Sequence, residues 1–456
     1  MPTRDRRSFL QATAATAGTV AVAPTVVLGK RGANERIRVG LVGLGGRMAS
    51  HIGCLKEMAE TDNVVIAAVC DCDRNQLESA AERFPDLKGL QLKTYHDQRA
   101  LFDDPSIDAV SFSTQDHWHA LQTIWACQAG KDVFIEKPAS WCIWEGRQMV
   151  KAARKYNCMV QVGMQNRSSP NVVEGMRKLK EGVIGEPYMA RGMTYKLRGN
   201  LGRHQVRPVP TGLDWDAWVG PARMVPYSSF NHRRWYWLEN FASGDVANQT
   251  VHDIDKIRWG LGLDEHPITL MSLGDRFVPG DDDDADTPNT QAFLCQWRDR
   301  KVLVTFEIRH WYTNSEAGMR DEYPFVAPNQ CVGEIFFGSE GYMIFPDYSS
   351  YHTFLGPRNE PGPSKADPPG IDWRTESIPH FRNWLQAIRS RRHEELAADI
   401  EEGHRSTTVC HLAKISARLG RSVHFDPQTE RFVDDPEADA FLKRDYREPY
   451  VVPDSV

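Results

Sequence analysis

Short apolar runs and helical patterns alternate along the first third of the chain. The predicted strands are 36–42, 64–70, 109–114 and 132–135, and the predicted helices between them are 49–58 and about 120–129. Strands that alternate with helices at this spacing are typical of βαβ units. The pattern therefore predicts a parallel sheet with helices packed against it.

In the second half of the chain β-rich runs follow one another. They lie at 188–196, 268–277, 290–297, 301–311 and 331–337. The third and fourth runs are joined at 298–300, as the two strands of a hairpin would be. This half is predicted to form a second domain built on a sheet.

One helix is predicted within the second half. Apolar residues recur there at helical spacing, and Gly262 follows the last of them; they are Val251, Ile254, Ile257 and Leu261. The same spacing places Asn248, His252 and Asp255 on another face. We expect this polar stripe to point into a cleft.

The composition of the 456 residues is that of an ordinary globular protein, with 41% hydrophobic and 25% charged side chains. It excludes a disordered chain, a collagen and a membrane protein with many spans. The net charge of -6 is too even for a nucleic-acid binder, so a small molecule is the expected substrate. Nine cysteines without a repeated CxxC pair are interpreted as reduced core thiols. No metal site is predicted, because the acidic run at 281–284 is typical of a solvated loop.

The first residues resemble an export signal. Arg6 and Arg7 precede Ser8-Phe9-Leu10, and a charge-free run extends from Ala12 to Leu28. This order is that of a twin-arginine signal, so residues 1–33 are interpreted as signal and linker, with an N-terminal membrane anchor as the alternative. The mature chain is then expected to be periplasmic or otherwise extracytoplasmic, without an integral span. It is expected in the cytoplasm only if the signal is not used.

A glycine-rich turn follows the first predicted strand directly. In a dinucleotide-binding unit the first glycine permits a tight turn, and the next lets the backbone approach the pyrophosphate at the helix N-terminus. A glycine turn without a ligand is the alternative. Met48 stands where a third glycine is usual. The residues assigned to a cofactor site are Gly43, Gly45, Gly46, Arg47 and Met48.

Polar residues at later strand ends extend this site. Asp71 ends the second strand, where an acidic residue hydrogen-bonds the adenosine ribose. A carboxylate there repels a 2′-phosphate, so the predicted cofactor is NAD, with NADP less favoured. Ligands bind at the carboxyl ends of parallel strands, so we add four residues: Thr114, His119, Glu136 and Lys137.

Five motifs together carry a resemblance to a known family. They are Gly43 to Gly46, Thr114 to His119, Glu136-Lys137-Pro138, Val162 to Arg167, and Ser243 to Asp255. From about residue 36 to the C-terminus the chain resembles the glucose-fructose oxidoreductase / inositol dehydrogenase (Gfo/Idh/MocA) family. The resemblance implies an α/β Rossmann domain with a parallel sheet, followed by an α+β domain whose open, largely antiparallel sheet closes over the nicotinamide. It also implies hydride transfer at a sugar or polyol carbon.

The resemblance also sets the predicted domains. Residues 34–160 are assigned to the NAD-binding domain, and residues 161–456 to a substrate-binding sheet domain with C-terminal helices and a tail. We expect a carbohydrate substrate, no nucleic-acid partner, and a homo-oligomer formed through the sheet domain.

Three side chains are candidates for the chemistry. Lys137 follows a strand end, so its ammonium can donate to a substrate hydroxyl or help to deprotonate it. His252 suits a general base, because imidazole titrates near working pH. Asn248 stands where dehydrogenases of the family usually carry Asp, and an amide orients a substrate but cannot carry a proton. The alternatives are a surface lysine and a buried histidine without chemistry.

Substrate contacts are expected from two places. Gln165, Arg167 and Asp255 belong to the family motifs. Arg234 and Trp235 lie in a stretch where cations stand beside aromatic rings, as they do in sites that bind sugars. Ordinary loop packing is the alternative for that stretch.

Export out of the cytoplasm would restrict the reactions that the protein can catalyse, because NAD(H) that is released there is not replaced. A retained cofactor with redox-neutral turnover satisfies this limit. The reaction is then oxidoreduction between two sugars, or transient oxidation of one carbon that permits elimination of a glycosidic substituent before the hydride returns. A conventional NAD(P)-dependent sugar or polyol dehydrogenase is the first alternative, and a non-catalytic nucleotide-binding protein is the second.

Overall fold

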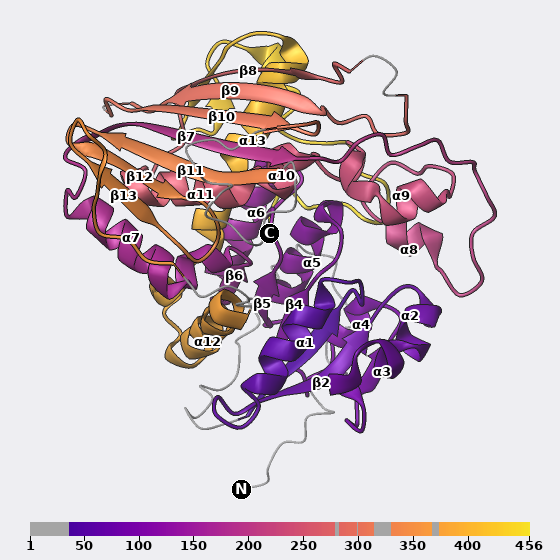
Figure 1. Ribbon diagram of the computed structural model, residues 1–456. Helices are drawn as coiled ribbons and strands as arrows, with labels where there is room; N and C mark the ends of the chain where they lie inside the picture. Colours follow the sequence, from indigo (N-terminus) through magenta and orange to yellow (C-terminus); the bar gives the residue numbers. More distant parts are fainter. Residues whose placement is uncertain (1–35, 279–281, 299, 314–329, 367–373) are drawn as a thin grey trace, which may run out of the picture.

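The computed structural model describes residues 36–278, 282–298, 300–313, 330–366 and 374–456 (Figure 1). Within them the chain forms a parallel sheet and then a larger, mostly antiparallel sheet, which confirms the predicted fold class. The predicted signal at 1–33, Asp281 and the turn residue Asp299 lie outside the described residues. No helix in the described ranges is both long enough and apolar enough to cross a membrane.

The first sheet is parallel throughout and has the strand order β3-β2-β1-β4-β5-β6. Its strands are β1 (Ile37–Val42), β2 (Val64–Cys70), β3 (Lys93–Tyr95), β4 (Ala109–Phe112), β5 (Asp132–Ile135) and β6 (Val160–Val162). Its helices are α1 (Met48–Glu57), α2 (Arg74–Glu78), α3 (Ala80–Arg83), α4 (Gln98–Phe102), α5 (Asp116–Gln128) and α6 (Ile143–Lys155), with a 3-10 turn at Pro85–Leu87. Strands β4, β5 and β6 are completely buried, as is usual in a parallel sheet that is covered on both faces.

Helix α5 begins earlier than predicted. The sequence pattern gave a helix from about Ala120, but the structure starts it at Asp116. An acidic side chain in the first turn is favourable at the positive end of the helix dipole. Consequently His119 lies within the helix rather than in a loop.

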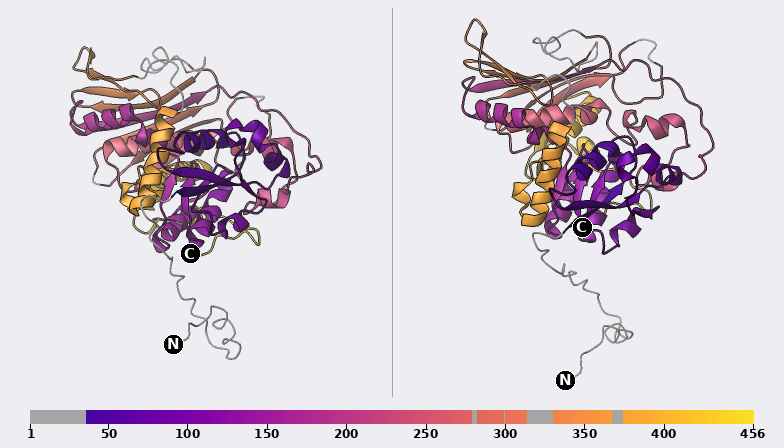
Figure 2. Two further views of the ribbon diagram at one scale, coloured as in Figure 1. Left: turned by 90° about the horizontal axis from the view of Figure 1, so that it is seen from below. Right: turned by 60° about the horizontal axis from the view of Figure 1, so that its bottom comes forward.

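The second sheet has the order β14-β13-β12-β11-β7-β10-β9-β8-β15-β16. Its strands are β7 (Pro187–Lys196), β8 (Thr269–Asp275), β9 (Thr290–Gln296), β10 (Leu303–Arg309), β11 (Gln330–Gly338), β12 (Gly341–Phe345), β13 (His352–Leu355), β14 (Glu360–Pro361), β15 (Val423–Asp426) and β16 (Arg431–Phe432). The central strand β7 runs parallel to β10 and antiparallel to β11. Figure 2 shows helices gathered on the side of this sheet that faces the parallel sheet.

Several helices follow β6 in the chain. They are α7 (Pro170–Lys180), α8 (Trp215–Val219), α9 (Ser229–Arg233), α10 (Asp245–Asn248), α11 (Thr250–Leu261), α12 (Arg374–Ser390), α13 (Ile400–Leu419) and α14 (Pro436–Asp439), with 3-10 turns at Gln165–Ser168, Trp235–Trp237 and His393–Glu395. Apolar side chains of α7, α11 and α13 pack in one cluster with the second sheet. Helix α11 ends at Gly262, whose φ of 62° is left-handed, as a glycine stop predicts.

The C-terminal helices return to the parallel sheet domain. Phe381 of α12 stacks on Phe134 of β5 with ring centres 3.9 Å apart. Trp384 donates from Nε1 to the carbonyl of Met159 at 3.2 Å. The core of the first domain therefore includes residues from near the end of the chain. In addition β6 extends to Val162, so the predicted boundary after residue 160 falls inside a strand.

Candidate active site

A cavity of about 580 Å³ opens at the carboxyl edge of the parallel sheet. Gly43, Gly45, Gly46, Arg47, Asp71 and Thr114 line it. Gly43 has a φ of +83°, and a Cβ at that position would lie 2.8 Å from the side chain of Thr114, so only glycine fits the turn. A Cβ on Gly45 or Gly46 would meet no atom within 4 Å, which leaves room for a ligand to approach their backbone. These features fit a dinucleotide phosphate.

Asp71 stands at the end of β2 beside the glycine turn. Its carboxylate accepts from the backbone N–H of Leu44 at 2.7 Å and of Asp73 at 2.9 Å. Its enclosed position raises the pKa of Asp71 to about 6, while these two bonds oppose the rise. Met48, in contrast, is fully buried in the core and does not line the cavity. Its side chain packs beneath the glycine turn rather than against a ligand.

Glu136 is the centre of a buried polar network beneath the cavity. Its carboxylate accepts from Arg47 Nε at 2.7 Å and bonds His51 Nε2 at 3.0 Å. The side-chain amide of Gln165 lies against Glu136 and Arg47. Burial opposes ionisation here, but Arg47 and His51 hold the pKa of Glu136 well below its usual value. His51 was not predicted, because a lone histidine after a glycine motif carries no signal in the sequence.

Lys137 joins the two domains. Its Nζ, at the end of β5, donates to the carbonyl oxygen of Asn248 at 2.5 Å and to its Oδ1 at 3.2 Å, at the end of α10. Its enclosed position lowers the pKa of Lys137, whereas the nearby Glu136 and Asp116 oppose the shift. The ammonium is therefore held between a strand of one domain and a helix of the other.

The amide of Asn248 has a defined orientation. Its Oδ1 accepts from Lys137, and its Nδ2 donates to Asp245 at 3.2 Å. Asp245 is buried and also pairs with Arg198 and His310, which keep the pKa of its carboxyl below the usual value against the effect of burial. Asn248 thus positions the lysine rather than facing solvent freely.

His252 is buried on the first turns of α11. No hydrogen-bond partner for its Nδ1 occurs among the described residues. Burial and the charge of Lys137 lower the pKa of His252 well below its usual value, so the imidazole is neutral. Its ring lies 5.5 Å from that of Tyr348. An unpartnered buried nitrogen of this kind is available to a ligand hydroxyl.

Three further residues, not predicted from the sequence, form a hydrogen-bonded row that ends at Tyr348, the ring beside His252. Gln249 donates to the hydroxyl of Tyr348 and accepts from Lys196. Burial lowers the pKa of Lys196 to about 8. Because these residues come from β7, the junction between α10 and α11, and the loop after β12, only the folded chain brings them together.

The predicted polar stripe on one helix is wrong in part. Helix α10 ends at Asn248 and α11 begins at Thr250, with Gln249 as the junction. Asp255 is buried and bonds Arg167 at 2.6 and 2.9 Å, and Ser406 at 2.7 Å. Arg167 also pairs with Glu402. Arg167 and Asp255 therefore satisfy each other and brace α11 against α13, and these contacts give no support to a role in binding substrate.

Other predicted residues have different surroundings from those expected. The ring of His119 bonds the carbonyls of Pro138 at 2.8 Å and of Thr114 at 3.3 Å. It therefore positions the backbone that follows β5 and the backbone that follows β4. Arg234 is exposed and donates to the hydroxyl of Tyr236 at 3.3 Å. Trp235 lines the same cavity as Asp71.

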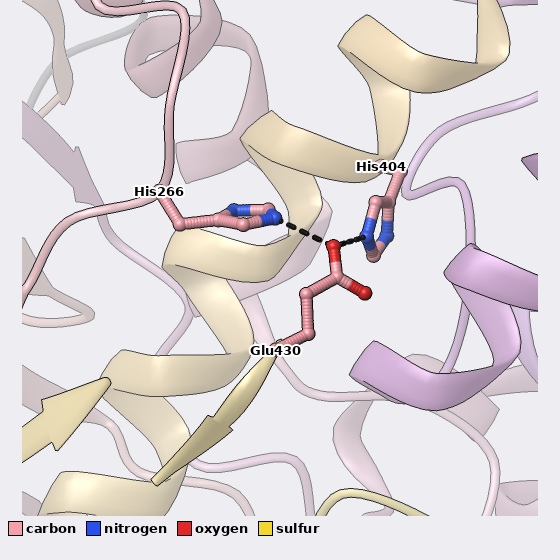
Figure 3. Close-up of side chains that lie close together, drawn as sticks. All are labelled: His266, His404 and Glu430. Carbon is pink, nitrogen blue, oxygen red and sulfur yellow. Dashed lines mark hydrogen bonds and ion pairs between the residues drawn. The ribbon is translucent and has the colours of Figure 1, made fainter. Parts of the chain in front are cut away.

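A separate cluster of titratable groups is drawn in Figure 3. His266 and His404 each bond one oxygen of Glu430 through Nε2, at 2.9 and 2.8 Å. Arg147 donates to both oxygens of the same carboxylate and also pairs with Glu401. These residue types can hold a metal ion. However, the guanidinium already supplies the positive charge that the carboxylate needs, so we interpret the cluster as an ion-pair network that ties the turn before β16 to α6 and α13.

The acidic loop is also satisfied by cations. Asp282 and Asp284 pair with Arg203, and Asp283 pairs with Arg276. The carboxylates of this loop therefore have positive partners within the protein itself. The absence of a metal site from the whole protein stays a prediction.

Two family models match the chain. The model GFO_IDH_MocA, described as an oxidoreductase family with an NAD-binding Rossmann fold, matches residues 37–164. The model of the C-terminal alpha/beta domain of this oxidoreductase family matches residues 172–277 and 365–452. Together these segments make up more than half of the chain. The protein therefore belongs to the Gfo/Idh/MocA oxidoreductase family, and its first domain is the NAD-binding domain of that family.

Relatives of assigned function match part of the chain. An inositol 2-dehydrogenase/D-chiro-inositol 3-dehydrogenase of Lactiplantibacillus plantarum is 30% identical over 153 residues, which are 33% of this chain and 42% of that enzyme. The rhizopine catabolism protein MocA of Rhizobium meliloti is 26% identical over 254 residues, which are 54% of this chain and 74% of that protein. The chain thus matches less than half the length of the dehydrogenase.

Solved structures match over most of the chain. Levoglucosan dehydrogenase in complex with NADH and levoglucosan has a TM-score of 0.63 at 18% identity, over 86% of this chain and 99% of that one. The WlbA dehydrogenase of Bordetella pertussis, in complex with NADH and UDP-GlcNAcA, has a TM-score of 0.62 at 19% identity over the same shares of the two chains. At such identities the likeness shows the shared fold.

The cluster around Glu430 is predicted to stabilise the fold without a metal. Glu430→Gln removes the charge that three donors share, so the free energy of unfolding should fall by about 1.5–3 kcal/mol. Urea unfolding measures this fall, and a chelator should leave the wild-type midpoint unchanged. Glu437→Gln is the matched control, because the Glu437 side chain is 70% exposed. A chelator that lowers the wild-type midpoint but not that of Glu430→Gln would identify a metal site instead.

Proposed function

We propose that this oxidoreductase uses NAD to oxidise a carbon of a sugar or sugar derivative, keeps the cofactor bound, and passes the hydride back to a sugar within the same catalytic cycle. One observation carries the proposal: the ammonium of Lys137, held by Asn248, lies near enough to the unpartnered ring nitrogen of His252 for its charge to lower the pKa of that imidazole. Oxidation of an alcohol needs a proton acceptor and a positive group near the developing alkoxide. These two side chains supply both.

Each residue then has a distinct part. When NAD is bound, its nicotinamide supplies the hydride acceptor. Backbone N–H groups of the glycine turn would hold the phosphates, and Asp71 would accept from the ribose. Lys137 donates to the hydroxyl that is oxidised, and His252 takes the hydroxyl proton at Nδ1. Asn248 positions Lys137 and carries no proton.

Retention of the cofactor is supported by the resemblance of residues 1–33 to a twin-arginine signal, which would take the folded protein out of the cytoplasm. Two reactions leave NAD unchanged overall. In one, a second sugar accepts the hydride. In the other, oxidation of one carbon acidifies the proton on its neighbour, loss of that proton expels the glycosidic group, and water and the hydride then add back.

A conventional sugar or polyol dehydrogenase is the second candidate. The inositol dehydrogenase among the relatives favours it, since that enzyme is named for oxidation of a cyclic polyol. Such an enzyme exchanges its cofactor in every cycle, which separates it from the first candidate.

Purified protein is predicted to carry NAD or NADH in near-stoichiometric amount. Mass spectrometry of the nucleotide released by denaturation identifies and quantifies it. NADP should be the minor species, because the carboxylate of Asp71 repels a 2′-phosphate. Protein that is folded yet releases no dinucleotide would contradict retention.

Substitutions should separate proton transfer from positioning. The substrate for this test is the first sugar in a panel that is found to reduce the bound NAD. With it, Lys137→Ala and His252→Ala should each lower kcat roughly 10²-fold or more. Asn248→Ala should cost roughly 10- to 100-fold, because Lys137 loses one acceptor but keeps its charge. His393→Ala serves as control, since His393 is an exposed histidine. Full activity of His252→Ala would show that α11 has only a structural role.

The pH profile tests the protonation state of His252. Its pKa is lowered well below the usual value, and a general base is active above its pKa. Turnover should therefore persist below pH of about 6.5, the ordinary histidine value, and fall only at more acidic pH. An acid limb centred near that ordinary value would contradict the assignment.

We also propose that a second copy of the chain covers the open face of the second sheet. Large apolar side chains of β8, β9 and β10 are exposed on it: Met271, Leu273, Leu294 and Leu303. A contiguous apolar patch of this kind marks an interface.

Light scattering is predicted to give a mass that is a multiple of the protomer mass. The double variant Leu273→Lys, Leu294→Lys should be monomeric, because it places charges in the patch. Val173→Lys is the control, since Val173 is 41% exposed on α7, which packs against the other face of the sheet. A monomeric wild-type protein at micromolar concentration would contradict the interface.

A further inference from the structure

The cavity that begins at the glycine turn has a second wall from outside the parallel sheet domain. This wall comes from the stretch between β7 and α10, and its residues are Asp214, Ala217, Trp218, His232, Arg233 and Trp235. We call residues 211–235, which contain α8 and α9, the cover segment. Figure 1 shows α8 and α9 beside α5, α4 and α2 of the first domain.

The cover segment is bonded to the strand end that carries Asp71. The N–H of Arg74 donates to the carbonyl of Gly212 at 2.9 Å, and the N–H of Asp214 donates to that of Cys72 at 3.0 Å. Asp73 and Leu213 form an isolated antiparallel bridge between these bonds. The segment therefore lies directly beside the acid that we assign to the adenosine ribose.

Helix α5 holds the segment at a second point. Trp118 donates from Nε1 to the carbonyls of Ala217 at 3.1 Å and Trp218 at 3.0 Å. Gly220 has a φ of +48°, and a Cβ there would lie 2.2 Å from the Trp118 ring. The close approach of the segment to this indole thus requires glycine.

The C-terminal tail forms a third attachment. Arg447 donates to the carbonyl of Gly220 at 3.1 Å, to the carbonyl of Asp216 at 2.8 Å, and to its carboxylate at 2.5 Å. The hydroxyl of Tyr450 donates to the same carboxylate at 3.2 Å. Tyr450 itself lines the cavity and packs edge to face on Trp118, so the tail closes the segment from outside.

The chemistry of this half of the cavity suits a purine nucleotide. Its walls carry flat rings from both sides, namely Trp118, Trp125, Trp218, Trp235 and Tyr450. Arg83, Arg99 and Arg233 place guanidinium groups on the wall, among the carboxylates of Asp71, Asp73, Asp97 and Asp214. Aromatic faces take up bases by stacking, and guanidinium groups bind phosphate. The nicotinamide end is at the opposite part of the sheet, where Lys137 follows β5.

We propose that the adenosine half of the dinucleotide is held between the parallel sheet domain and the cover segment, and that the bonds of Arg447 and Tyr450 to Asp216 control how fast it leaves. This inference rests on the proposed function and deepens it, because it names what keeps the cofactor in place. ADP-ribose, which has no nicotinamide, should be held by the same contacts.

The test measures the rate at which labelled NAD, or labelled ADP-ribose, dissociates from the protein when excess unlabelled ligand is added. Arg447→Met and Asp216→Ala should each release both ligands about 10-fold faster or more, because charge-assisted bonds to the segment are lost. Arg431→Met is the control, since that exposed arginine pairs with Asp439 away from the cavity. The side chain of Asp216 is 56% exposed, so Asp216→Ala decides the question if Arg447→Met does not fold.

Release at the wild-type rate from either folded variant would overturn the inference. The proposed function fails by a different result, namely wild-type protein that exchanges its cofactor faster than it turns over. Slow wild-type release with unchanged variants would refute only the role of the cover segment. Slow wild-type release with faster variants supports both.

Discussion

The bond between the Lys137 ammonium and Asn248 is the contact on which the candidate site depends. A buried ammonium is costly unless acceptors surround it, and here one residue of the other domain offers both its carbonyl and its side-chain oxygen. This requirement aligns the end of β5 with the end of α10. It thereby brings His252, one turn further along the chain, to the same place.

Beneath this contact, Glu136 connects the lysine to the cofactor loop. Its carboxylate holds Arg47 of the glycine turn and His51 of α1. The partners are needed, because a carboxylate that is 6% exposed would otherwise lose its ionised form. A second buried pair, Lys256 with Glu334 at 2.8 Å, fixes α11 to β11 in the same way. Buried charges therefore set the orientation of the groups that we assign to proton transfer.

The sequence predicted the parts of the fold that depend on local pattern. The strand at 64–70 and the helix that ends before Gly262 are as predicted, because period and glycine stops are local signals. It did not show the surroundings that tertiary contacts decide. Asp255, which fits a helical stripe, pairs with Arg167, and Trp235, which stands among cations and aromatic residues, lines the same cavity as Asp71. No local signal showed that residues 211–235 would bond the chain next to Asp71, or that the tail would bond Asp216, since the partners are more than 100 residues apart in the sequence.

The central claim is that the hydride returns to a sugar within one cycle. The most direct measurement follows it with a substrate deuterated on carbon, with mass spectrometry of both the sugar products and the free nucleotide. The account predicts that the deuterium of the oxidised carbon is found in a sugar product and that free nucleotide carries none. Deuterated NADH released in an amount equal to the turnover would contradict it and would identify a conventional dehydrogenase.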